Sequence, residues 1–404
     1  MKYLFFFNII IAIALYKTTE YKLQTPYFTY YGLFFFIGLL FLNFFLLIFW
    51  KFEKLKILGI IFLLIPIFNF FSGFIIYSLN INDNLFPRLN KNETKEVLIK
   101  NNTGFNLDID NKFKFSTDYF GFRKNTYKKI NYLNKNSNHR IVIFGASTTL
   151  NDHLDDRLTW SNLLQQKLNS SGLNTEIINT GINGLTARQN YKTFLGMSRY
   201  QIDTAIFLIG ANDWHLQLRN PKKVESIFYY LFNIEDTILY QFTRNIRDKI
   251  PMLNNPTSAP GMELTKNQTK IDLEKSSPKL KRKYLIKKVS ADFNYHVNKI
   301  INICSKKKIR CIFLTQPNIF HDELDEKYNN LLQTNYLKNE DMAKLTKLFN
   351  DFLLSKKEKN ILVFDLDSKI KKNILYFRDD IHFTKLGAEK VSSELFDFLI
   401  ERIF

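Results

Sequence analysis

Hydrophobic residues follow two patterns along this chain of 404 residues, and the first predicts a membrane anchor. Residues 30–50 and 57–79 contain no charged side chain. Each run is long enough to cross a hydrocarbon core of about 30 Å as a helix, so we expect two transmembrane helices. A shorter apolar run over residues 3–16 predicts a third helix, with a cleaved signal peptide as the alternative. We therefore assign residues 1–80 to a membrane anchor.

The loop between the two long apolar runs predicts the orientation of the chain. Residues 51–56 contain three lysines and one glutamate. Lysine and arginine in short loops favour the cytoplasmic side of a membrane. The second long run then leads away from the cytoplasm. We therefore expect everything after residue 80 to lie outside it.

Beyond the anchor, the second pattern predicts an α/β fold. Residues 81–137 are rich in Asn and Lys, show little periodicity and are interpreted as a juxtamembrane segment. From residue 138, short apolar runs typical of buried strands alternate with stretches of helical periodicity. We expect strands at 140–144, 175–178, 204–209, 309–315 and 361–364, and helices at 160–168, 187–197, 284–304, 338–355 and 384–403. This alternation predicts a three-layer α/β/α domain over 138–404, with a mostly parallel sheet covered on both faces.

One segment interrupts the alternation of strands and helices. Residues 216–283 contain Pro251, Pro256, Pro260 and Pro278 among many Asn, Lys and Ser residues. Proline and small polar residues favour turns and loops. We therefore expect an insertion in the α/β domain here, either a lid over a site or a plain surface excursion.

Composition narrows the class of protein. With 46% hydrophobic residues and 16% aromatic residues, the chain is not wholly disordered. Only two cysteines are present, which excludes a disulfide framework and a multi-cysteine metal module. For Cys304 and Cys311 we favour two buried thiols, although a compartment outside the cytoplasm permits a disulfide. We attribute the net charge of +19 to a lysine-rich background rather than to acidic glycan or anionic lipid partners, and no nucleic-acid motif is present.

Polar residues that can support catalysis follow several of the predicted strands. In parallel sheets, ligands bind at the carboxyl ends of the strands. Ser147, Gly184 and Asn212 follow the first three strands, and Asp379 and His382 follow the last. A histidine can take the proton of a serine hydroxyl, and a carboxylate orients the histidine. The backbone N–H groups of Ser147 and Gly184 and the side-chain amide of Asn212 can stabilise an oxyanion.

Acidic residues and a histidine crowd the loop after the serine, at Asp152, His153, Asp155 and Asp156. A metal site is one interpretation of this loop, but we favour a solvated acidic loop. The six histidines of the chain do not show the spacing typical of metal ligands. We therefore expect neither a metal nor another cofactor.

Four sequence blocks resemble the motifs of the SGNH hydrolases, the family of GDSL-type esterases and lipases. Residues 144–149 contain the serine, 179–184 the glycine, 210–213 the asparagine and 379–382 the aspartate and histidine, in the order typical of that family. Ala146 departs from the pattern at a position where Asp is common. The resemblance implies an α/β hydrolase with a Ser147–His382–Asp379 triad, and an oxyanion hole formed by Ser147, Gly184 and Asn212.

The predicted anchor and this resemblance together lead to one main hypothesis. Residues 119–123 and 314–317 also resemble segments of membrane-anchored members of the family. We expect a membrane-anchored serine esterase or acylhydrolase that acts outside the cytoplasm, for example as a deacetylase of an envelope glycan or lipid. The alternatives are an O-acyltransferase that uses the same site and a non-catalytic envelope protein that binds glycan or lipid.

Overall fold

The computed structural model describes part of the chain, and all of that part belongs to one compact unit. The described residues are 87–98, 112–219, 221–226, 287–321, 324, 337, 339–356, 358 and 360–404. The predicted membrane helices at 3–16, 30–50 and 57–79 lie outside these ranges, as does most of the predicted insertion at 216–283. Within these ranges, no helix combines the length and the apolar character that a membrane span requires.

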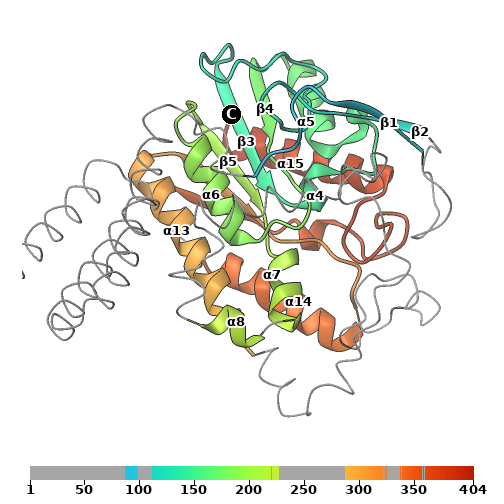
Figure 1. Ribbon diagram of the computed structural model, residues 1–404, viewed down its shortest axis with the longest axis vertical. Coiled ribbons are helices and arrows are strands. Elements are labelled where there is room, and N and C mark those ends of the chain that lie inside the picture. Colours follow the sequence, from blue (N-terminus) through green and yellow to red (C-terminus); the bar gives the residue numbers. More distant parts are fainter. Residues whose placement is uncertain are drawn as a thin grey trace, which may run out of the picture. The chain divides into compact units, whose positions relative to one another are not determined.

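Five parallel strands form the central sheet, in the order β4-β3-β5-β6-β7. Figure 1 labels β4, β3 and β5 of this sheet. The strands are β3 (His139–Gly145), β4 (Thr175–Asn179), β5 (Thr204–Leu208), β6 (Arg310–Leu314) and β7 (Ile361–Phe364). Most residues of β3, β4, β5 and β6 are buried. Burial on both faces explains why the sequence shows continuous apolar runs rather than an alternating pattern. The prediction of an α/β fold with a mostly parallel sheet is confirmed.

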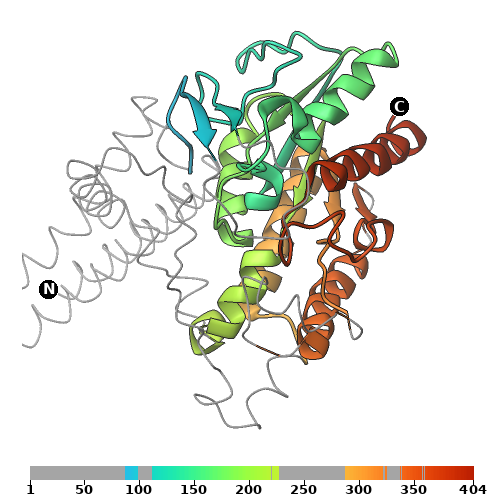
Figure 2. The ribbon, with the colours of Figure 1, turned by 90° about the vertical axis from the view of Figure 1, so that its right-hand side faces the viewer.

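Helices cover both faces of this sheet (Figures 1 and 2). On one face α5 (Trp160–Ser170) packs beside α15 (Lys385–Arg402), and on the other α6 (Ala187–Met197) packs beside α13 (Ala291–Lys307). The other helical segments are α14 (Asn339–Leu354), α7 (Ala211–Arg219), α8 (Pro221–Glu225), α4 (Ser147–Leu150) and the 3-10 turns Asp156–Leu158 and Asp367–Lys369. The predicted insertion at 216–283 therefore begins inside α7.

Side-chain caps fix where two of these helices begin. The predicted helix at 284–304 begins only at Ala291, because the Ser290 hydroxyl accepts the backbone N–H of Phe293 at 3.3 Å. The Thr384 hydroxyl accepts the N–H of Gly387 at 3.1 Å and caps α15. The second cap matters for the site, because Thr384 lies two residues after His382.

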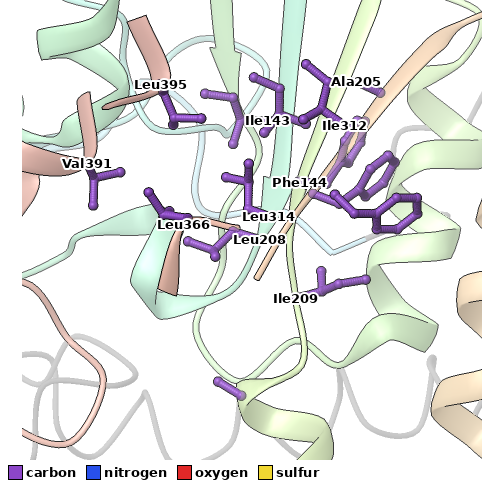
Figure 3. Close-up of a cluster of buried hydrophobic side chains, with 14 of the residues drawn as sticks. Ile143, Phe144, Ala205, Leu208, Ile209, Ile312, Leu314, Leu366, Val391 and Leu395 are labelled. Carbon is purple, nitrogen blue, oxygen red and sulfur yellow. The ribbon is translucent and has the colours of Figure 1, made fainter. Parts of the chain in front are cut away.

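The two faces of the sheet bury different side chains. On the α6 face, Phe144, Phe207 and Phe313 are register partners in adjacent strands. Their rings stack with centroid separations of 5.0 and 5.1 Å, and Phe194 of α6 packs edge-on against the first two. On the opposite face, aliphatic side chains of the strands meet those of α15, as Figure 3 shows for Ile143, Leu208, Leu314, Val391 and Leu395. Because parallel strands alternate their side chains between faces, one strand contributes to both cores.

The segment before β3 packs onto the α/β domain. β1 (Thr94–Leu98) and β2 (Lys112–Ser116) form a two-stranded antiparallel sheet. Phe122 is fully buried, and the buried Arg123 guanidinium lies 3.2 Å from the Asp156 carboxylate. The boundary predicted at residue 138 therefore comes too late, because residues 112–137 already belong to the packed domain. The sequence hides this packing, since much of it depends on polar and charged side chains.

Cys304 and Cys311 form a disulfide, with their Cα atoms 6.1 Å apart. Cys304 lies in the last turns of α13, and Cys311 lies in β6. Lys308 ends α13 in the left-handed conformation, with φ at 54°, and turns the chain back beside the helix. Our preference for two free thiols is therefore wrong, because this turn brings two cysteines seven residues apart into bonding distance.

Candidate active site

The candidate site lies where the strand order of the sheet reverses. From β3 the chain first adds β4 on one side of β3, then crosses to the other side and adds β5, β6 and β7 in that order. The loops after β3 and β5 therefore diverge at the carboxyl ends of these strands, where α/β sheets bind ligands. Ser147 lies two residues after Gly145, the last residue of β3, and Asn212 lies four residues after Leu208, the last residue of β5. Topology thus brings these two predicted site residues to the same edge.

A tight turn between β3 and α4 presents the serine. Ser147 is the first residue of α4, and Gly145 ends β3. A Cβ atom at Gly145 would lie 2.0 Å from Thr149 Oγ1 and 2.7 Å from the Leu208 carbonyl oxygen. Only glycine therefore fits between strand and helix at this turn. At the other end of α4, Asn151 adopts the left-handed conformation, with φ at 50°, and ends the helix after one turn.

Ser147, His382 and Asp379 form one hydrogen-bonded series. His382 Nε2 lies 2.7 Å from Ser147 Oγ, which joins residues 235 positions apart in the sequence. His382 Nδ1 lies 2.8 Å from Asp379 Oδ2. Asp379 Oδ1 also accepts the backbone N–H groups of Ile381 at 3.0 Å and of His382 at 2.7 Å. The short loop from 379 to 382 therefore fixes its own carboxylate and its imidazole together.

Asp379 and His382 each stabilise the charged form of the other. Burial would raise the pKa of Asp379, but the charge of His382 and the hydrogen bond to it hold this pKa below its usual range. Burial would lower the pKa of His382, but the charge of Asp379 and the same hydrogen bond outweigh burial and raise it. Asp379 is therefore ionised at neutral pH. An ionised carboxylate beside an imidazole stabilises the imidazolium that forms when the histidine accepts a proton.

Asn212, in the first turn of α7, is bonded to the loop that contains Gly184. Asn212 Nδ2 donates to the Leu185 carbonyl oxygen at 3.0 Å, and Leu185 directly follows Gly184. An amide nitrogen carries two N–H groups, so this bond uses only one of them. Both Asp213 oxygens accept the backbone N–H of Ala187 at 3.0 Å. Gly184 is exposed and has a positive φ of 77°, a conformation that favours glycine.

Sequence reasoning missed Asp213 as the residue that joins the second and third motif blocks.

The expectation of a solvated acidic loop after the serine is wrong, because this loop is largely buried. Asp156 is 3% exposed and His153 is 8% exposed. Asp155 and Asp156 accept the backbone N–H groups of Lys114 and Ser116, so they hold β2 against the domain. The density of charge in so short a loop was the available signal. Among the residues that the structure describes, no group of three or more His, Cys, Asp and Glu is arranged to hold a metal ion.

His215 is a further imidazole near the site. It lies on α7, three residues after Asn212, with its Nε2 4.0 Å from Asp380 Oδ2. Burial lowers the pKa of His215 to about 3, with a further lowering from the charges of Arg219 and His382. This imidazole is therefore neutral when His382 changes its charge.

Comparisons with solved structures find several hydrolases. A lipase/acylhydrolase from Enterococcus faecalis is 16% identical, with a TM-score of 0.35 and coverage of 65% of this chain and 96% of that one. An acetyl xylan esterase is 14% identical, with a TM-score of 0.35 and coverage of 64% and 99%. An esterase from Pseudoalteromonas sp. is 13% identical, with a TM-score of 0.34 and coverage of 65% and 98%. A search of curated proteins finds no match.

The family comparison covers more than half of the chain. The model of the GDSL-like lipase/acylhydrolase family matches residues 141–395, a range that includes all four motif blocks. The match agrees with the family resemblance of these blocks, which the sequence shows on its own. The protein is thus an ester-bond hydrolase, and it belongs to the GDSL-like lipase/acylhydrolase family.

Proposed function

We propose that the protein is a membrane-anchored serine esterase in which Ser147 is the nucleophile, His382 the general base and Asp379 the residue that orients the base. The observation that carries the proposal is the hydrogen-bonded series Ser147–His382–Asp379, with contacts of 2.7 and 2.8 Å. His382 takes the proton of the Ser147 hydroxyl as its oxygen attacks the acyl carbon of an ester. The imidazolium then gives this proton to the departing alcohol.

Three donors stabilise the oxyanion that this attack creates. They are the backbone N–H groups of Ser147 and Gly184 and the second N–H of the Asn212 side chain. Ser147 contributes its own N–H because it stands at the first position of α4, where the backbone N–H has no partner within the helix. Such donors act without reorganisation during the reaction, and removing one costs about 10²–10³ in rate.

Water completes the reaction. It attacks the acyl group on Ser147, His382 takes its proton, and the free acid leaves. An O-acyltransferase would use the same acyl intermediate and the same residues, with a sugar hydroxyl in place of water. We favour hydrolysis because the family is one of acylhydrolases. A non-catalytic binding protein fits less well, since binding alone does not require an ordered Ser–His–Asp series.

The proposed location is the outer side of a membrane. The apolar runs at 30–50 and 57–79 and the lysines between them support an anchor with the hydrolase domain outside the cytoplasm. The Cys304–Cys311 disulfide supports the same location, because disulfides persist in oxidising compartments and are rare in the cytosol. An acylated envelope glycan or lipid is the proposed substrate class.

Ester hydrolysis by the full-length chain in detergent tests the proposal. The substrates are p-nitrophenyl acetate, butyrate and octanoate, and the variants are Ser147→Ala and His382→Ala. We expect both variants to lose at least about 10³-fold in kcat while their circular dichroism spectra stay unchanged. Equal rates in wild type and variants would exclude these residues as the catalytic ones. Labelling of Ser147 by a fluorophosphonate without any ester hydrolysis would favour the transferase, which then needs an added sugar acceptor.

A further inference from the structure

Three side chains outside the proposed triad join the loops around the serine. Asn183 Nδ2 donates to Asp152 Oδ2 at 2.5 Å. Asp152 Oδ1 lies 3.5 Å from His153 Nδ1, and His153 Nε2 lies 2.7 Å from the Phe383 carbonyl oxygen. Asn183, Asp152 and His153 form what we name the linking triplet. It connects the second motif block, the loop after α4 and the loop that carries His382.

Each end of the linking triplet is attached beside a proposed catalytic group. Asn183 directly precedes Gly184, which supplies an oxyanion donor in the proposed function. Phe383 directly follows His382, and the His153 ring packs edge-on against the His382 ring with centroids 5.7 Å apart. Movement of the linking triplet would therefore displace the oxyanion donor and the base together.

The middle residue of the linking triplet, Asp152, carries a charge in largely buried surroundings. The side chains of Asp152 and His153 are 18% and 9% exposed. Burial would raise the pKa of Asp152, but hydrogen bonding and charge from His153, and the bond from Asn183, lower it to about 2. The carboxylate is therefore ionised at neutral pH. Hydrogen bonds to an ionised acceptor are about twice as strong as neutral ones, so this carboxylate can hold a loop in place.

We propose that Asp152 is a positioning residue for ester hydrolysis, which holds the Gly184 loop through its hydrogen bond with Asn183 and packs beside His153, whose Nε2–H donates to the His382 loop. The inference rests on the proposed function, because it assigns Asp152 a task only in relation to the Ser147–His382–Asp379 triad. It also accounts for charged residues that the sequence presents as an ordinary solvated loop.

Asp152 also contributes to the charge around the base. The titratable groups that face His382 are Asp379 and Asp380 from its own loop, Asp152 and His153 from the loop after α4, and His215 from α7. The negative charge of Asp152 is one of the causes that raise the pKa of His382. Removing this charge therefore lowers that pKa, whereas removing Asn183 leaves the charge in place. The two residues can thus be separated by experiment.

The experiment compares Asn183→Ala and Asp152→Asn in the full-length chain, with p-nitrophenyl acetate as substrate. Asn183→Ala breaks the link to Gly184, and we expect kcat to fall about 10- to 10²-fold with little change in KM, as for a small displacement of catalytic groups. Asp152→Asn keeps an oxygen that accepts the Asn183 N–H, so its kcat falls less. Its acid limb in the profile of kcat/KM against pH moves to lower pH.

Two controls make the result specific. Asp155→Asn makes the same substitution in the same loop, at a residue that bonds β2 instead of the site, and we expect wild-type kcat and an unmoved acid limb. Ser147→Ala tests the proposed function itself. If Ser147→Ala is inactive while folded Asn183→Ala and Asp152→Asn behave as wild type, the positioning role is overturned and the esterase stands. If Ser147→Ala stays active, the proposed function fails instead. Should Asn183→Ala not fold, the kcat of folded Asp152→Asn decides, and a wild-type kcat overturns the positioning role.

Discussion

Two buried carboxylates near the site, Asp156 and Asp379, accept backbone N–H groups in similar ways but face different partners. Asp156 Oδ1 accepts the Ser116 N–H at 2.8 Å and lies 3.2 Å from Arg123 Nη2. Asp379 Oδ1 accepts the His382 N–H at 2.7 Å, and its Oδ2 lies 2.8 Å from His382 Nδ1. The geometry around the two aspartates is therefore alike, and the cationic partner is the main difference.

The partner decides what each aspartate can do. Burial lowers the pKa of Arg123 to about 10, so the guanidinium still keeps its charge at neutral pH. This ion pair is permanent, and it fastens the segment before β3 to the loop after α4. An imidazole gains and loses a proton near neutrality. The same kind of carboxylate beside His382 therefore supports proton transfer, whereas beside Arg123 it supports only the fold.

The largest expected effect separates these two aspartates by activity. Asp379→Asn removes the charge that stabilises the imidazolium, and we expect kcat to fall by about 10⁴-fold without unfolding. Asp156→Asn is the matched control and should leave kcat of the folded protein within a few-fold of wild type. Rates with p-nitrophenyl acetate measure kcat of each variant, and thermal unfolding shows that each variant is folded. A similar loss of kcat in the two variants would remove the distinction.

Stability should distinguish the Arg123–Asp156 pair from the His382–Asp379 pair in the opposite way to activity, with the larger loss at Arg123–Asp156. Arg123→Met leaves Asp156 buried without its cation, and we expect unfolding to become easier by about 3–5 kcal/mol. Urea unfolding followed by circular dichroism measures this. Asp379→Asn should lose much less stability, because the amide still accepts the backbone N–H groups. A destabilisation by Arg123→Met of under about 1 kcal/mol would show that the ion pair does not hold the segment.

The disulfide offers a third test, away from both carboxylates. Replacing Cys304 and Cys311 by alanine frees a short closed loop, for which chain entropy predicts a loss of about 2–3 kcal/mol. The value of kcat should not change, because the bond joins α13 to β6. Urea unfolding with and without a reductant checks the stability, and the double variant should no longer respond to the reductant. A fall in kcat would instead connect this turn to the site.

The smallest effect concerns pH. In the proposed mechanism His382 acts as a base only when it is neutral, and its pKa is raised by Asp379 and by further acidic groups. Activity should therefore fall as the pH decreases through this raised pKa, about tenfold per pH unit below it. The acid limb of kcat/KM should lie above the usual histidine range of about 6.5. Arg123→Met should not move it, and an acid limb below that range would contradict the raised pKa.

Much of this fold is predictable because its parallel strands are buried on both faces. The apolar runs at 140–144, 175–178 and 361–364 differ from β3, β4 and β7 by at most one residue at either end. Ser147, His382 and Asp379 were predictable as a group, since each follows a strand at the same edge of the sheet. Their proximity in the structure agrees with that prediction, and their catalytic roles stay a prediction until variants are measured.

The features missed from the sequence depend on contacts between distant polar residues. The sequence places Arg123 in the expected juxtamembrane segment and Asp156 in a loop expected to be solvated, and only the folded chain shows that they form a buried ion pair. The Cys304–Cys311 bond depends on the left-handed turn at Lys308, which spacing alone does not reveal. Asn183 and Asp152 read as loop residues, because a hydrogen bond between two loops leaves no periodic signal. Patterns of hydrophobicity therefore predict the layers of strands and helices well, and they predict hydrogen bonds and ion pairs between distant residues poorly.

The separation of 235 positions between Ser147 and His382 has a consequence for how the enzyme is synthesised. Ribosomes add about 5–20 residues per second, so the proposed nucleophile is synthesised roughly 10–50 s before its proposed base. The base also needs α15, because the Thr384 cap that begins this helix lies two residues beyond His382. In the proposed function, a growing chain therefore carries the serine without the group that activates it, and hydrolysis begins only once the last helix has docked beside α5.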